Sequence, residues 1–134
     1  MHQGNYDGRN GAGQKVVYRA EKLLAAHTTS VDTKSDEPVI KIEAHFTRKT
    51  NIVFRKVTYH YEVKTEYVLG ESVRRRVNTG KDVILEPFKD VDAAAAWAES
   101  EPTLKGSDFV KDMRANFAAA ANDFVNAEPD VLQF

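Results

Sequence analysis

Hydrophobic and polar positions alternate most regularly between Val39 and Thr47, near the middle of the chain. The apolar positions of this run are Ile40, Ile42, Ala44 and Phe46, and the polar ones are Lys41, Glu43, His45 and Thr47. A period of two residues is typical of a β-strand, because successive side chains point to opposite faces of a sheet. The run therefore predicts a strand with one apolar face and one polar face.

A second alternation follows a predicted turn at residues 48–52. Its apolar positions are Val57, Tyr59, Tyr61, Val63 and Tyr67, and its polar ones are Lys56, Thr58, His60, Glu62, Lys64 and Glu66. β-Branched and aromatic residues favour the pleated surface of a strand, and two such runs joined by a short turn predict an antiparallel hairpin. We expect the two polar sets to share one face of the sheet and to stay open to solvent.

The first residues of the chain contain turn signals. Four glycines lie among residues 4–13, including the pairs Asp7-Gly8 and Asn10-Gly11. Such pairs mark tight turns. They favour a short hairpin between residues 1–6 and 14–19.

Two further segments are less regular. Residues 15–27 have apolar side chains at helical spacing, whereas Val16-Val17-Tyr18 suits a strand, and on periodicity alone we expect a helix. A polar loop over residues 28–38 follows. Residues 73–85 predict one or two strands, interrupted near residues 78–80, and Pro87 ends strand pairing or confines it to a sheet edge.

Helical spacing replaces alternation after about residue 90. Asp92 is a candidate N-cap for a helix over residues 93–98, and Pro102 breaks this helix. Ser107 or Asp108 caps a second helix. The predicted core residues of the two helices, most of them spaced to form one apolar stripe, are Trp97, Phe109, Met113, Phe117 and Phe124.

Strands followed by helices predict an α+β fold, with an antiparallel β-sheet followed by two C-terminal α-helices. The 134 residues fit a single domain. Within it we expect an N-terminal hairpin or helix with its loop over residues 1–38. The sheet follows over residues 39–90, and the helices with a short tail over residues 91–134.

Composition narrows the classes of function. The formal net charge is −1 at pH 7, whereas a protein that binds nucleic acid by charge alone is usually strongly basic. Any contact with nucleic acid must therefore come from a local patch. The absence of cysteine excludes disulfides, thiolate nucleophiles and cysteine-ligated zinc. No stretch approaches the roughly eighteen apolar residues of a membrane span, and we expect no membrane partner and no cofactor.

No motif indicates catalysis. The chain contains no glycine-rich phosphate loop, no His-Glu-x-x-His run and no Gly-x-Ser-x-Gly run. His45 and His60 would be neighbours on the polar face, either as a metal pair or as two exposed histidines. The lack of a third ligand with diagnostic spacing favours the second interpretation. The run Arg74-Arg75-Arg76 is a candidate for contact with phosphate. Successive side chains of a strand would point to opposite faces, however, so the three cannot form one patch.

One nine-residue run resembles a known family. Residues 55–63 read Arg-Lys-Val-Thr-Tyr-His-Tyr-Glu-Val. They are similar to the Arg-Lys-x-Thr-x-Lys-x-Glu-Val run in the central strand of the coat proteins of single-stranded RNA bacteriophages, with His60 in place of the second lysine. The order of elements over residues 38–134 and the aromatic end of the tail, Leu132-Gln133-Phe134, also resemble that family. The chain departs from it at residues 15–27, where the family has a long β-hairpin, and in its longer helical region.

The resemblance implies a structural function. In that family two chains pair their sheets edge to edge, the helices of each chain clasp the partner, and the dimers form an icosahedral shell. The inward face of the sheet binds a hairpin of the phage genomic RNA. By this resemblance the chain is a homodimeric, shell-forming virion protein and not an enzyme. The RNA-binding residues that it implies are Lys41, Glu43, His45, Thr47, Thr58, His60 and Lys64.

Two other functions stay open. One is a small α+β module that binds a nucleic acid or a protein with its polar sheet face and forms no shell. The other is a hydrolase that uses His45, His60 and Glu62. It ranks last because the sequence offers neither a nucleophile nor an oxyanion site.

Overall fold

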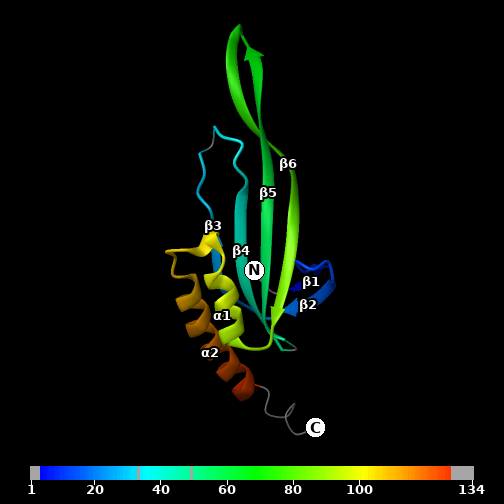
Figure 1. Ribbon diagram of the computed structural model, residues 1–134, viewed down its shortest axis with the longest axis vertical. Helices are drawn as coiled ribbons and strands as arrows, with labels where there is room; N and C mark the ends of the chain where they lie inside the picture. Colours follow the sequence, from blue (N-terminus) through cyan, green and yellow to red (C-terminus); the bar gives the residue numbers. More distant parts are fainter. Residues whose placement is uncertain (1–3, 33, 49, 128–134) are drawn as a thin grey trace.

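The computed structural model describes residues 4–32, 34–48 and 50–127. Over these residues a mixed β-sheet is followed by two α-helices, which confirms the predicted α+β class (Figure 1). The strands are β1 (Gly4–Arg9), β2 (Lys15–Ala20), β3 (Lys22–Thr28), β4 (Val39–Thr47), β5 (Asn51–Val68) and β6 (Glu71–Phe88). The helices are α1 (Val91–Glu99), the 3-10 turn η1 (Pro102–Leu104) and α2 (Phe109–Ala127).

The sheet has the strand order β2-β1-β6-β5-β4-β3. Neighbours are antiparallel except β1 and β6, which are parallel and, within the described part of the chain, pair only at Arg9 and Ile84. The expectation of a purely antiparallel sheet is therefore wrong at this junction. Because so few residues join β1 to β6, the β1–β2 hairpin can fold across one face of the remaining strands.

A hairpin forms near the N-terminus as predicted, but Asp7 and Gly8 lie within β1, so the turn is at the Asn10-Gly11 pair alone. The register of the hairpin runs from Gly4 opposite Ala20 to Arg9 opposite Lys15. The Asn10 side chain accepts hydrogen bonds from the backbone N–H groups of Ala12 and Gln14, at 3.0 and 2.9 Å. These bonds hold the turn. Residues 1–3 of the prediction lie outside the described residues.

The helix expected over residues 15–27 is wrong, because these residues form β2 and β3. Their apolar side chains enter two different cores. Tyr18 and Ala20 pack against β5 and β6, whereas Leu24 and Ala25 pack against the helices. The apparent helical spacing thus comes from two short strands with a bulge between Leu23 and Ala25. Strand pairing overrides a weak local pattern.

The helices cover one face of the sheet and form the larger core. Phe54 of β5 is fully buried and stacks on Trp97 of α1, with ring centroids 4.5 Å apart. Phe109 and Met113 are buried as predicted, whereas Trp97 and Phe117 pack against the core from half-buried positions. The side chain of Phe124 lies outside the described part of the chain.

The first helix begins two residues earlier than predicted, because its N-cap is not Asp92. Asp90 is its N-cap, and its carboxylate accepts a hydrogen bond from the backbone N–H of Asp92 at 3.0 Å. Asp92 lies in the first turn instead. There its carboxylate pairs with Arg114 of α2 at 2.8 Å and links the two helices.

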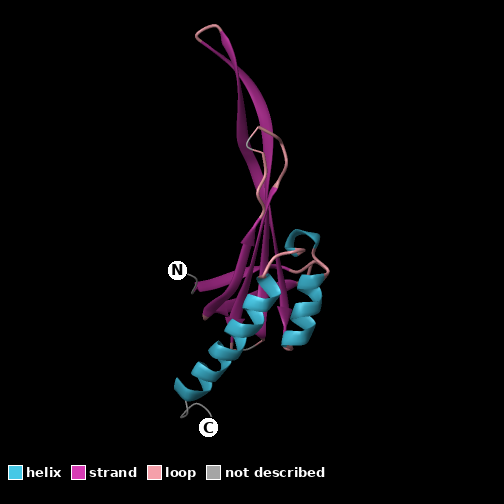
Figure 2. Ribbon diagram, turned by 90° about the vertical axis from the view of Figure 1, so that its left-hand side faces the viewer, coloured by secondary structure: helices cyan, strands magenta, loops and turns pink. Residues whose placement is uncertain are grey.

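β5 and β6 continue far beyond the other strands. Each has 18 residues, but β4 pairs with β5 only as far as Val39 opposite Tyr59. Residues 60–80 therefore form a two-stranded arm that projects from the sheet (Figure 2). The arm ends in a tight turn at Leu69 and Gly70, which have φ angles of 52° and 83°, as two-residue hairpin turns require.

β6 is one strand, and its predicted interruption is a bulge. The register shifts where His60 faces Gly80 and Tyr61 faces Asn78, so Thr79 is the extra residue. A bulge increases the local twist of a hairpin. It lies where the arm leaves the sheet and so sets the direction of the arm.

The packing of Phe54 predicts a large loss of stability on truncation. Phe54→Ala should lower the free energy of unfolding by about 3–5 kcal/mol, because it leaves a cavity under Trp97. Val73→Ala on the arm, where the side chain is 43% exposed, should change it by less than about 0.5 kcal/mol. Urea denaturation followed by tryptophan fluorescence measures both. Equal effects of the two changes would contradict this helix packing.

Candidate functional site

The β4–β5 register divides the predicted polar face between two sides of the sheet. Thr58 pairs directly with Ile40, and Lys41 pairs with Val57. Directly paired residues place their side chains on the same face. The side of the sheet that the helices cover therefore includes Thr58, His60 and Lys64. The other side includes Lys41, Glu43, His45 and Thr47. The prediction of one shared polar face is wrong.

The turn explains this outcome. Thr47 pairs with Asn51, so the residues between them close the hairpin. This register sets the polar positions of β4 opposite the apolar positions of β5. A shift of one residue would have exchanged the two faces, and the alternation within each strand contains no information about that shift.

Three predicted RNA-binding residues are buried. The exposed fractions of Glu43, His45 and Thr47 are 5%, 0% and 3%. The β1–β2 hairpin covers them, and the rings of Tyr6 and Tyr18 lie 5.6 and 6.0 Å from the His45 ring. The polar face is therefore not open at the base of the sheet, and RNA cannot reach these three residues in this chain.

Glu43 is the centre of a buried charge cluster. Its carboxylate lies 3.5 Å from His45 Nε2, 3.6 Å from Lys41 Nζ and 3.7 Å from Arg55. The nearby His45 ring is the largest effect that lowers the pKa of Glu43 to about 2, and the positive charges of Lys41 and Arg55 add to it against the opposing effect of burial. Burial raises the pKa of Tyr18. The cluster ties β4 to β5 beneath the hairpin.

His45 and His60 are not neighbours. His45 pairs with Val53, and His60 pairs with Gly80 on the opposite side of the sheet. The described residues contain no group of three or more histidine, aspartate or glutamate side chains that could hold a metal ion. The prediction that these two histidines are neighbours, on which the hydrolase hypothesis depended, is therefore wrong.

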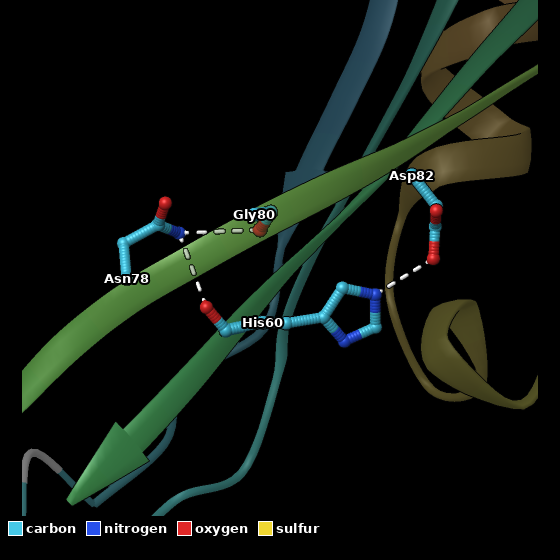
Figure 3. Close-up of polar contacts among 4 residues, drawn as sticks. All are labelled: His60, Asn78, Gly80 and Asp82. Atoms are coloured by element: carbon cyan, nitrogen blue, oxygen red, sulfur yellow. Dashed lines mark hydrogen bonds and ion pairs between the residues drawn. The ribbon is translucent and has the colours of Figure 1, made fainter.

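His60 lies instead at the base of the arm (Figure 3). Its Nε2 atom is 2.7 Å from Asp82 Oδ2. The Asn78 amide donates to the backbone carbonyls of His60 and Gly80 at 3.2 and 3.4 Å. Gly80 has a φ of 152°, which favours glycine. These contacts bridge the bulge, so His60 belongs to the joint between the arm and the sheet.

The two faces of the arm, taken together with the first residues at its base (residues 59–82), differ sharply in charge. We call one of them the cationic face. Its residues, which pair across the hairpin, are Tyr59, Tyr61, Val63, Thr65, Tyr67, Ser72, Arg74, Arg76, Asn78 and Lys81. This face has three cations and no acid over residues 59–82, all of which the structure describes. The opposite face has the cations Lys64 and Arg75 and the acids Glu62, Glu66, Glu71 and Asp82.

Arg76 connects the cationic face to the loop before β4. Its guanidinium lies 3.6 Å from the centre of the Tyr61 ring. It donates hydrogen bonds to the backbone carbonyls of Ser35 and Glu37, at 3.0 and 2.5 Å. Arg74 and Lys81 stay exposed. As predicted, Arg75 points to the opposite face, where it pairs with Glu66 at 3.3 Å.

The sequence patterns did not predict the cationic face, although they contained its separate parts. The alternation of Tyr59, Tyr61 and Tyr67 was identified, and so was the alternation of the arginine run. Whether the tyrosines and the arginines share one face depends on the β5–β6 register, which places Arg74 opposite Thr65 and Arg76 opposite Val63. A bulge after His60 changes this register by one residue, and no local signal marks its exact position.

Comparisons with known proteins give no family for the chain: no protein-family model, curated protein or solved structure matches it. Among the described helices, none is long and apolar enough to cross a membrane. The function must therefore be argued from the geometry of the sheet and its arm.

The buried Glu43 cluster predicts a dependence of stability on pH. The pKa of Glu43 lies below its ordinary value of 4.5, at about 2, so its stabilising contribution is complete above about pH 4.5 and is lost as the pH falls towards 2. Glu43→Gln should remove a contribution on the order of 3 kcal/mol at pH 7 and flatten the acid limb of the stability curve. Urea titrations from pH 7 to pH 2 measure this.

The matched control is Glu62→Gln, which removes an exposed carboxylate from the arm. It should keep the acid limb of the unmodified protein. If Glu43→Gln also keeps that limb, the Glu43 cluster does not contribute to stability as described.

Proposed function

We propose that the chain is a self-assembling structural subunit, the coat protein of an RNA phage shell, which holds RNA on the cationic face of its arm. The observation that supports this proposal best is the arm itself. Its outer strand, β6, meets β1 only at Ile84 among the described residues, so the edge over residues 71–83 has no strand partner there. An isolated two-stranded hairpin is marginally stable in water.

The open edge of β6 favours pairing with a second copy. A long unpaired edge presents a row of backbone N–H and C=O groups, which a strand of another chain can satisfy. Antiparallel pairing of β6 with β6 of a second copy would extend the sheet across a dimer. This is the arrangement that the resemblance at residues 55–63 implies. In that arrangement the helices also contribute to the dimer, and α2 runs past the end of the sheet, as Figure 2 shows.

The cationic face favours RNA as the second partner. Single-stranded nucleic acids bind where cations follow the backbone and aromatic rings stack on the bases. Three tyrosines of β5 and three cations of β6 share this face, and Lys41 lies on the same side of the sheet. The acids of the opposite face would repel phosphate. Of the seven residues first expected to bind RNA, Lys41 remains in the proposed set.

Electron microscopy of the protein expressed alone tests the proposed function. We expect closed particles of uniform diameter, with a ratio of absorbance at 260 and 280 nm that reveals bound nucleic acid. Small discrete oligomers without nucleic acid, over a range of salt and protein concentrations, would contradict the coat function. They would favour the small binding module that forms no shell.

Charge removal from the two faces of the arm tests the RNA assignment. Arg74→Gln with Lys81→Gln should weaken binding to a short single-stranded RNA roughly tenfold, because two phosphate contacts are lost. The slope of log affinity against log salt should fall in magnitude by about 1.4. Filter-binding titrations at several salt concentrations measure both quantities.

The matched control removes the same charge from the opposite face, with Lys64→Gln and Arg75→Gln. It should change the affinity by less than about threefold and leave the salt slope almost unchanged. An equal loss in the two double variants would mean that binding follows net charge, and the assignment to the cationic face would be wrong.

A further inference from the structure

The tip of the arm is apolar and exposed. We define the tip as residues 67–71. The exposed fractions of Leu69, Tyr67 and Val68 are 100%, 80% and 50%. Tyr67 and Val68 point to opposite faces of the arm, and Leu69 lies in the turn between the strands, so the tip presents apolar surface on both faces and at its end. Exposed apolar surface of this kind marks contact sites.

A groove lies at the other end of the molecule, between β2 and the turn that joins β4 to β5. Its volume is about 460 Å³, within the range of about 300–1,000 Å³ typical of ligand pockets. Its lining residues are Val17, Tyr18, Arg19, Glu21, Thr47 and Arg48, with Thr50 at its end. Val17 is 65% exposed and gives the groove an apolar wall.

The groove and the tip have complementary charges. Arg19 and Arg48 both contact Glu21, at 3.9 and 3.6 Å, so these three residues have a net charge of +1. The side chains of the two arginines are still 74% and 47% exposed. The single charged residue of the tip is Glu71. We propose that the tip of one copy docks in this groove of a second copy, with Leu69 against Val17 and Glu71 beside the two arginines.

The groove of the same chain is out of reach of the tip. β5 begins at Asn51, next to the groove residue Thr50, and ends at Val68 in the tip. A strand of 18 residues spans roughly 55–60 Å. The occupant of the groove must therefore belong to another molecule.

The contact joins two different surfaces, so a two-fold dimer would contain it twice, with the tip of each copy in the groove of the other. It rests on the self-assembly proposed above and assigns residues to it. Antiparallel pairing of β6 edges would direct each tip towards the base of the partner, the end that holds the groove. A repeated tip–groove contact could equally connect neighbouring dimers around a closed shell.

Disulfide trapping tests this contact, because the chain contains no cysteine. Chains with Leu69→Cys and chains with Val17→Cys are mixed, allowed to assemble and oxidised under mild conditions. Both positions are exposed, so folding should be unaffected. A disulfide needs Cα atoms within about 7 Å, and mass spectrometry of the cross-linked peptides identifies which residues are joined. The control mixture combines Leu69→Cys with Ala119→Cys, an exposed position on α2.

We expect a 69–17 disulfide in most assembled chains and none between 69 and 119. A 69–69 disulfide would overturn the inference, because the tips would then meet one another. Assemblies seen by light scattering without a 69–17 disulfide would overturn the inference but not the proposed function. Chains that stay monomeric would overturn both.

A charge exchange gives a second, independent measurement. Glu71→Arg should raise the protein concentration needed for assembly roughly tenfold, since it places like charges together. Adding Arg19→Glu and Arg48→Glu to the same chain should restore most of the loss. Failure of this rescue, with assembly still weakened, would show that Glu71 acts elsewhere and would overturn the groove assignment.

Discussion

The register between β4 and β5 is the constraint on which the rest of the structure depends. Because Thr47 pairs with Asn51, Ile42 and Phe54 face the helices, while Glu43, His45 and Val53 face the β1–β2 hairpin. The hairpin can cover this second side because it brings Tyr6 and Tyr18 against His45. The same alternation, continued along β5, places Tyr59, Tyr61 and Tyr67 together on the arm. One turn therefore determines the core, the buried charge cluster and the cationic face.

The base of the sheet and its arm have opposite physical characters. At the base both faces of the sheet are covered. The aromatic rings are packed there and Glu43 is paired, so a partner chain would add little to the stability of the base. Along the arm both faces are open and neither strand has a further strand partner among the described residues. The tip residues Tyr67 to Leu69 are apolar. A hairpin of this kind gains stability chiefly by contact with another chain. The chain thus divides into a self-sufficient base and an arm suited to a partner.

Local patterns predicted the elements better than the relations between them. The bounds of β4 agree with the structure, and so does the burial of Phe109 and Met113, because alternation and helical spacing are local properties. Residues 15–27 were assigned wrongly since two short strands that enter different cores imitate helical spacing. The polar face of Thr58, His60 and Glu43 was assigned wrongly for a different reason. Register is a property of pairs of strands, and a difference of one residue reverses every side chain.

The proposed assembly and the proposed RNA binding are compatible on one arm because they would use different parts of it. Edge-to-edge pairing of β6 about a two-fold axis normal to the sheet keeps the same face of both copies on the same side. The two cationic faces would then form one surface with six cations, while the helices and the acids of Glu62, Glu66 and Asp82 lie on the other side. A shell needs such two-sided dimers. A chain of net charge −1 can provide them without strong repulsion between subunits, since its cations are concentrated on one face.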